Sequence, residues 1–410
     1  MTISMTDDQM AAALEALTAE TRSLHRACIR LLARTQPSLA EDISLTHSAY
    51  FELAGTPRDP ANLSYAALFE RLGPIGDVMP PIAVATVPHS ALWAATGLLG
   101  ESWLVAIPLG VISFYRQFCT IVLTARDLHA DDPDLAASTA AMSRLFGEHL
   151  EFGLVDLSGA DQLPQKTKPI IEHLTQLAYE FFILHEACHA RERHKEPDAH
   201  ATTYYQEAHL RHADEFSADR WAFNTLLSSF SNEMHLVALA VFMLFDALDA
   251  LDRFDFAPMA RVTHPSPAAR KWRITRLLQA PDALKFLDEE KLEEARDFAL
   301  LYERLAAFIV DRSNPTTPLN DILNRTAEAG PQAFIASITP MLARGNPERI
   351  IRNLSSVRAT TTEWAQGGNP DDEEFVIKVN NCIDGLAAEI NTVPRLRGLA
   401  ADLINAASAN

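Results

Sequence analysis

Two histidines and a glutamate within five residues are the feature of the sequence that points most directly to chemistry: His185-Glu186-Ala187-Cys188-His189. The segment lies within a pattern typical of a helix, where residues four apart share one face. His185 and His189 can therefore direct two imidazoles at one metal ion. Glu186 lies beside them, where a carboxylate can take a proton from a metal-bound water. In a chain with 14 histidines this spacing alone is only moderately specific.

A second motif, in the segment 214–219, supplies the rest of a metal site. Glu215 and Asp219 are four residues apart on a predicted helix, so both project from one face. Two imidazoles and one carboxylate leave the fourth position of a zinc ion for water, which is the arrangement of a catalytic site. We therefore predict one zinc ion per chain, held by His185, His189 and Glu215. Asp219 suits a different task, accepting the free N–H of a ligand histidine and fixing its tautomer.

Several competing interpretations stay open from the residues alone. His209 and His212 lie on neighbouring turns of the predicted helix that carries Glu215, and both compete with it as third ligand. Cys188 adjoins a ligand, but a cysteine at this position is expected to be a small buried core residue. In the simplest alternative, His185 and His189 are ordinary core or surface residues of a helix and bind no metal. The second motif makes this alternative less favourable.

Together the two motifs resemble the gluzincin metallopeptidases, and they are most similar to the CaaX-endopeptidase and HtpX-type group. The resemblance implies that an E-x-x-A-D helix, here Glu215 to Asp219, provides the third ligand. The segment 263–270, with His264-Pro265, resembles the family's His-Pro segment, in which a histidine is thought to face the tetrahedral intermediate. A turn that begins a helix is the alternative interpretation of that segment. A weaker likeness is to soluble bacterial gluzincins of phage exclusion or stress signalling, which cleave one cytosolic protein.

The resemblance implies a zinc-dependent endopeptidase that acts on a cytosolic protein or peptide. Zinc would polarise the scissile carbonyl, and Glu186 would be the general base on the zinc-bound water. His264 would hydrogen-bond the developing oxyanion. The strand expected at 103–107 would offer an edge to which an extended substrate adds as a further strand. Two alternatives remain: a regulatory or interaction protein with a vestigial zinc site, and a zinc hydrolase of a non-peptide amide.

The elements expected around these motifs describe an α+β fold that is mostly α. The catalytic part is expected to hold a small β-hairpin or sheet and two zinc-ligand helices. Strands are predicted at 82–87, 92–98 and 103–107. Helices are predicted over 7–35, 64–72, 109–127, 135–150, 169–194, 203–229, 232–252 and 265–278, and throughout 281–408 between Pro- and Gly-containing breaks.

Three regions follow from this pattern: an N-terminal helical segment (1–78), a gluzincin-like catalytic domain (79–279) and a C-terminal helical domain (280–410). The resemblance covers roughly 80–275. The chain departs from the family by an insertion at about 117–168, by the lack of flanking transmembrane helices and by its C-terminal region. That region is compatible with self-association, with binding of a regulator or substrate, and with covering of the cleft, and the sequence does not choose among these.

Charge and composition limit the binding partners and the cellular compartment that we expect for this protein. The formal net charge of −19 argues against nucleic acid or an anionic membrane as a partner. The apolar stretches 82–115 and 236–245 are too interrupted or too short to span a membrane. Four widely spaced cysteines indicate reduced thiols, and the N-terminus has no signal-peptide pattern, so we expect a cytoplasmic protein.

Overall fold

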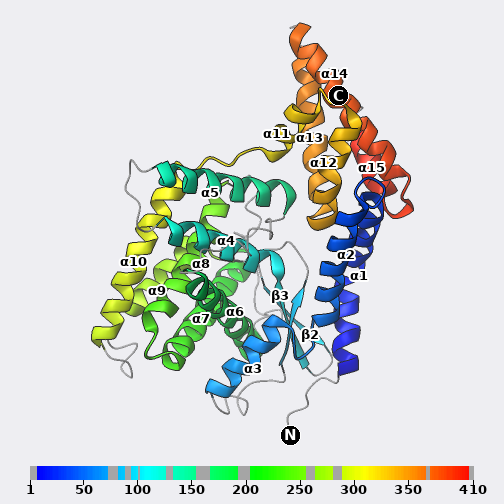
Figure 1. The fold of residues 1–410 in the computed structure, drawn as a ribbon. Helices are drawn as coiled ribbons and strands as arrows, with labels where there is room; N and C mark the ends of the chain where they lie inside the picture. The colour runs from blue at the N-terminus through cyan, green and yellow to red at the C-terminus, as the bar shows by residue number, and fades with distance from the viewer. Residues whose placement is uncertain are drawn as a thin grey trace.

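The protein is mostly helical and has one small sheet, which confirms the predicted α+β, mostly α class (Figure 1). The structure, a computed structural model, describes residues 7–72, 82–87, 94–99, 102–125, 133–153, 167–192, 204–254, 264–279, 289–365 and 370–405.

The sheet has three strands in the order β1-β3-β2. β2 and β3 pair antiparallel as the predicted hairpin, and β1 pairs with β3 in parallel. The prediction that the strand at 103–107 offers a free edge is wrong, because β3 is paired on both sides. Among the described strands, β1 and β2 form the two edges. The strands are β1 (Ile82–Val87), β2 (Ala95–Leu99) and β3 (Ser102–Pro108).

Eight helices and the inner face of the sheet share the main hydrophobic core. The inner face is formed by alternate strand residues such as Val84, Val105 and Ile107, as the two-residue period of a strand requires. These helices are α3 (Pro60–Leu72), α4 (Leu109–Thr124), α5 (Pro133–Phe152), α6 (Lys168–Glu192), α7 (Tyr204–Ser229), α8 (Met234–Phe254), α9 (Pro267–Leu278) and α10 (Glu289–Arg312).

Helix α8 is the helix in the described part of the chain that is long and apolar enough to cross a membrane. Within the fold it packs against α6, α9 and α10, and 78% of its most apolar window is buried by other parts of the protein. Its apolar surface is therefore used in the core.

Helix α6 is buried on every side from Leu177 to Ala190, so the charged residues of that stretch need partners inside the protein.

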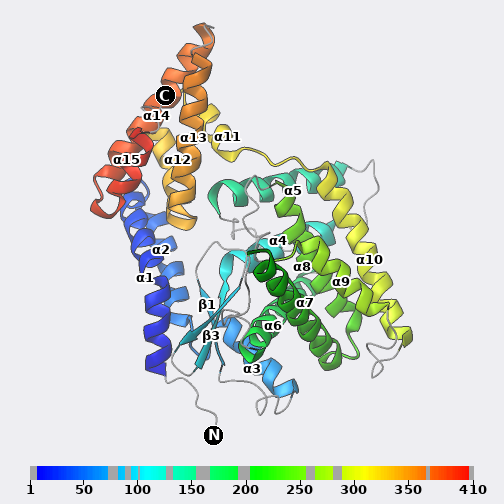
Figure 2. The ribbon, with the colours of Figure 1, turned by 180° about the vertical axis from the view of Figure 1, so that it is seen from behind.

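A second core joins the two ends of the chain. Helices α1 and α2 pack with α11–α15 (Figure 2). Phe152 at the end of α5 also enters this core. Three of these helices begin with proline directly after a predicted break, which suits proline because the first helical N–H needs no partner. The helices are α1 (Asp7–Leu32), α2 (Pro37–Leu53), α11 (Pro318–Thr326), α12 (Pro331–Arg344), α13 (Pro347–Ala365), α14 (Pro370–Asn391) and α15 (Arg397–Asn405).

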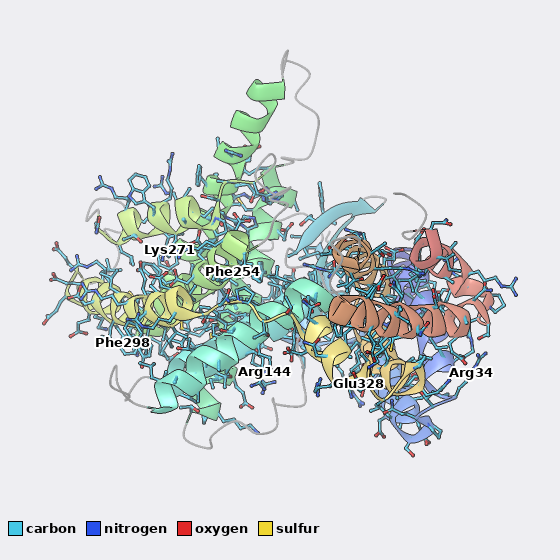
Figure 3. The ribbon with its side chains drawn as sticks, turned by 90° about the horizontal axis from the view of Figure 1, so that it is seen from above. Arg34, Arg144, Phe254, Lys271, Phe298 and Glu328 are labelled. Atoms are coloured by element: carbon cyan, nitrogen blue, oxygen red, sulfur yellow. The ribbon has the colours of Figure 1, made fainter. Side chains whose placement is uncertain are left out.

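The second core contacts the rest of the molecule at the sheet and along α5. Ala13 and Leu14 of α1 cover the outer face of the sheet at Ala85 and Leu104. Helix α5 runs between the two parts, with Arg144 labelled on it in Figure 3. The sheet therefore has α1 on one face and the helices of the main core on the other.

Candidate metal centre

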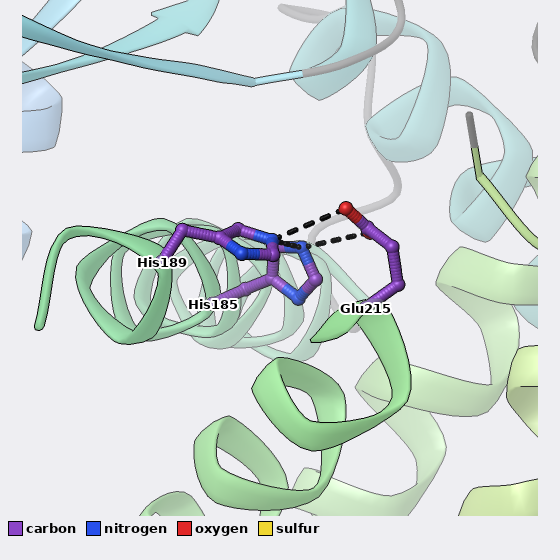
Figure 4. Close-up of side chains that lie close together, drawn as sticks. All are labelled: His185, His189 and Glu215. Carbon is purple, nitrogen blue, oxygen red and sulfur yellow. Dashed lines mark hydrogen bonds and ion pairs between the residues drawn. The ribbon is translucent and has the colours of Figure 1, made fainter. Parts of the chain in front are cut away.

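The three predicted ligands lie together at the contact of α6 and α7 (Figure 4). His185 Nε2 is 3.1 Å from His189 Nε2. The Glu215 carboxylate faces both rings, with Oε2 3.3 Å from His185 Nε2 and Oε1 3.2 Å from His189 Nε2. Ligand atoms about 2.0–2.1 Å from a tetrahedral zinc ion are about 3.3 Å apart, so the three side chains are spaced as zinc ligands would be.

The cluster has the character of a metal site. His185, His189 and Glu215 are 4%, 4% and 7% exposed, so bulk water does not solvate their polar atoms. Although Glu215 Oε2 is 3.3 Å from His185 Nε2, it is buried and accepts no hydrogen bond from the described residues. The nearest arginine or lysine group to this oxygen among the described residues is the Arg270 guanidinium, whose Nη1 is 3.7 Å away, so the oxygen keeps room for a metal ion as a closer partner. The residues present therefore fit a zinc ion.

Electrostatics point the same way. Burial alone would raise the pKa of Glu215, but contact with His185 and His189 lowers it far below its ordinary value. Burial alone would lower the pKa of His185, but contact with the Asp219 and Glu215 carboxylates raises it to about 9. The cluster is thus arranged to hold positive charge, which a divalent metal supplies.

His212 does not join the ligands, although sequence alone kept it as a competitor of Glu215. Its side chain is outside the His185, His189 and Glu215 group, and its Nε2 is buried without a hydrogen-bond partner among the described residues. The side chain of the other competitor, His209, lies outside the described residues.

Asp219, one turn after Glu215 on α7, lies behind His185. Its Oδ1 is 3.0 Å from His185 Nδ1, so a proton on Nδ1 leaves Nε2 free to bind a metal. Arg270 donates to the same carboxylate, from Nε to Oδ2 at 2.8 Å and from Nη2 to Oδ1 at 2.6 Å. Sequence reasoning gave Arg270 no role, although it ends the His-Pro segment 263–270. Its position six residues after His264, at the end of that segment, was the available signal.

Local helix chemistry holds Arg270 in place. Ser266 caps α9, its hydroxyl accepting from the Ala269 N–H at 3.2 Å, and Pro267 occupies the first turn. Arg270 is then one turn into the helix, 4% exposed, and its guanidinium also lies over the Phe245 ring at 5.1 Å. The turn-forming interpretation of the His-Pro segment is therefore compatible with a role in the site.

Glu186 faces the sheet across the site. Its side chain is 6% exposed, and the hydroxyl of Thr96 on the edge strand β2 donates to its Oε2. Thr96 was also missed by sequence reasoning, because nothing in the sequence relates a strand residue to a helix 90 positions later. The contact places β2, rather than β3, beside the predicted base.

His264 lies beside Glu215 and is partly exposed. Its Nε2 is 3.5 Å from Glu215 Oε1, and its side chain is 37% exposed. Burial lowers the pKa of His264, which favours the neutral ring. Thr263, the residue before it, lies outside the described residues.

A comparison with known families adds one finding. Residues 157–287 match the family model described as Peptidase U49. The matched range covers less than half of the chain, but it contains both ligand motifs and the His-Pro segment. The match supports a peptidase and does not distinguish the gluzincin or HtpX-type group. No curated protein and no solved structure matches the chain significantly.

Proposed function

We propose that the protein is a zinc-dependent endopeptidase of the gluzincin type. The observation that carries the proposal is the convergence of His185, His189 and Glu215 with the carboxylate of Glu186 beside them, inside the range that matches a peptidase family. A site built only for structure would close all four metal positions with protein ligands and would need no neighbouring base.

Each residue of the site has its own role in the proposed hydrolysis. His185, His189 and Glu215 would hold the zinc ion, which supplies a Lewis acid and a water of lowered pKa when bound. Glu186 takes the proton from the attacking water and delivers it to the leaving amine. Thr96 holds the Glu186 carboxylate by its hydrogen bond, so that the base does not have to be oriented by substrate.

Substrate would bind between β2 and His264. β2 reaches Glu186 through Thr96 and is an edge among the described strands, so its outer side is suited to pairing with an extended peptide. His264 is partly exposed beside Glu215, where a ring N–H can donate to the oxyanion of the tetrahedral intermediate. The proposed substrate is a cytosolic protein or peptide, in keeping with four buried cysteines that form no disulfide.

The test compares the wild type with Glu186→Gln on a library of proteome-derived peptides, with cleavage followed by mass spectrometry. Glutamine keeps the size of the side chain and removes the base, so cleavage should fall about 10²- to 10⁴-fold while zinc content stays unchanged. Glu192→Gln is the matched control, because it makes the same change on the same helix at a partly exposed position outside the site. Undiminished cleavage by Glu186→Gln would remove Glu186 from the role of base.

A further inference from the structure

An arginine-rich face lies next to the metal centre, on the outer side of α7 and α9. We call it the α7–α9 arginine face. Arg273 of α9 stacks over the Phe216 ring of α7 at 4.4 Å, which joins the two helices into one surface. Arg220 is four residues after Phe216, and Arg276 is three residues after Arg273, so each continues the surface on its own helix. The residues of the face are Phe216, Arg220, Trp272, Arg273 and Arg276.

The three arginines of this face have no acidic partner among the residues that the structure describes. Within the part of the chain that the structure describes, Arg220, Arg273 and Arg276 are exposed and form no ion pair with Asp or Glu. Some other exposed arginines pair with carboxylates, such as Arg253 with Asp249 and Asp311. The chain carries 54 acidic and 35 basic side chains, so three neighbouring arginines without an acidic partner form a local charge opposite to that of the molecule.

An exposed aromatic residue completes the face. Trp272 is 59% exposed, and the Arg276 guanidinium lies 5.8 Å from its ring centre. Tryptophan and arginine are the residue types most enriched among the residues that dominate binding energy at protein interfaces. An exposed tryptophan among free arginines therefore fits a binding surface better than a solvated helix face.

The face borders the proposed site. Phe216 directly follows the ligand Glu215, and Arg273 is one turn along α9 from Arg270, which contacts Asp219. A helix rises about 1.5 Å per residue, so Arg276 is about 9 Å further along α9 than Arg270. An extended peptide covers that distance in roughly three residues.

We propose that the α7–α9 arginine face binds an acidic segment of the protein substrate, a few residues from the bond that is cleaved. This deepens the proposed function and rests on it, because it names the substrate class of that site. Charge complementarity argues for the occupant: guanidinium groups pair with carboxylates in a bidentate geometry, and an acidic protein repels acidic segments elsewhere on its surface. The same repulsion disfavours nucleic acid, which needs a longer basic surface than three arginines provide.

The test measures binding of fluorescein-labelled deca-glutamate to the full chain by fluorescence anisotropy at 50 and 500 mM NaCl. The chain carries Glu186→Gln in all samples. The face variant combines Arg220→Gln, Arg273→Gln and Arg276→Gln. A matched control combines Arg26→Gln, Arg304→Gln and Arg325→Gln, three exposed arginines outside the face.

We expect the face variant to bind deca-glutamate about tenfold more weakly at 50 mM NaCl, and we expect 500 mM NaCl to remove the difference. Trp272→Ala alone should weaken binding about threefold. Equal affinity in the face variant, or an equal loss in the control, would overturn the proposal. Tighter binding of a 20-nucleotide single-stranded DNA, lost in the face variant, would also overturn it and assign the face to nucleic acid.

Binding in this assay needs neither zinc nor the base Glu186. Failure of the acidic-segment proposal is therefore distinguishable from failure of the peptidase proposal, which is read from peptide cleavage by the wild type.

Discussion

Replacing Arg270 with glutamine tests whether the Arg270–Asp219 pair positions His185, which we propose as a zinc ligand. Both groups of the pair are nearly inaccessible to solvent, at 4% and 1% exposure, and two hydrogen bonds of 2.8 and 2.6 Å join them. Without the guanidinium, the buried carboxylate keeps the contact with His185 Nδ1 at 3.0 Å as its main support. Breaking a buried pair in this way costs about 3–5 kcal/mol of unfolding free energy. The loss of support for a ligand histidine should lower zinc affinity about 10- to 100-fold.

The assay is a double-mutant cycle of Arg270→Gln, Asp219→Asn and the double variant. Urea unfolding of the metal-free proteins gives stability, and competition with a chromophoric chelator gives zinc affinity. Burial alone would raise the pKa of Asp219, but Arg270 and His185 lower it below its ordinary value of 3.8. The contribution of the pair is therefore fully present at pH 7 and is lost as the pH falls through the folded-state pKa.

In this cycle the double variant should be less destabilised than the sum of the single variants, by about 1–3 kcal/mol, because no buried charge is then left without its partner. The positioning role of the pair would be refuted if the two single losses of stability add to the double loss within about 0.5 kcal/mol and zinc affinity is unchanged in both single variants.

Three further predictions concern other residues. Thr96→Val removes the hydroxyl that donates to Glu186, so kcat for peptide cleavage should fall about tenfold at unchanged zinc content; an unchanged kcat would show that this bond does not orient the base. His264→Gln should lower kcat about 10²-fold and leave zinc bound, whereas loss of zinc would identify His264 as a ligand. Burial raises the pKa of Glu151 from its ordinary value of 4.5 to about 7. Between these pH values the folded protein keeps a proton that the unfolded chain releases, so the free energy of unfolding falls as the pH rises. In urea unfolding, the free energy of unfolding of Glu151→Gln minus that of the wild type should therefore increase by about 1–2 kcal/mol from pH 4.5 to pH 7.5. A difference that does not change with pH would contradict the raised pKa of Glu151.

The grouping of His185, His189 and Glu215 could be predicted from the sequence because it depends on local helix geometry. Four-residue spacing places His185 with His189 on one face of α6, and Glu215 with Asp219 on one face of α7, whatever the rest of the chain does. The only non-local step was the contact of α6 with α7, which the family resemblance supplied.

The supporting residues could not be predicted in this way. Arg270 and Thr96 reach the site from elements 51 and 90 positions from their partners, and no periodicity relates such residues. The sheet order shows the same limit. The β2–β3 hairpin is a local feature, but the parallel pairing of β1 with β3 turns the expected edge strand into the central one.

The same reasoning explains why the second core could not be foreseen. Periodicity predicted α1 and the C-terminal helices separately, since each has an apolar face. It does not say which faces meet. His25 Nδ1 on α1 contacts the Ala343 carbonyl of α12 at 2.8 Å, across 318 positions of sequence. Only the folded chain shows that the N-terminal helices share a core with the C-terminal ones.

The most direct test of the metal centre is zinc content, measured by plasma mass spectrometry on the wild type and on Glu215→Ala. Glu233→Ala serves as the matched control, because Glu233 lies just before α8 and pairs with His173 at a partly exposed site. We predict about one zinc ion per wild-type and control chain, and loss or marked weakening of binding in Glu215→Ala. A folded wild type that contains no zinc and takes up none when it is added would contradict the proposed zinc peptidase.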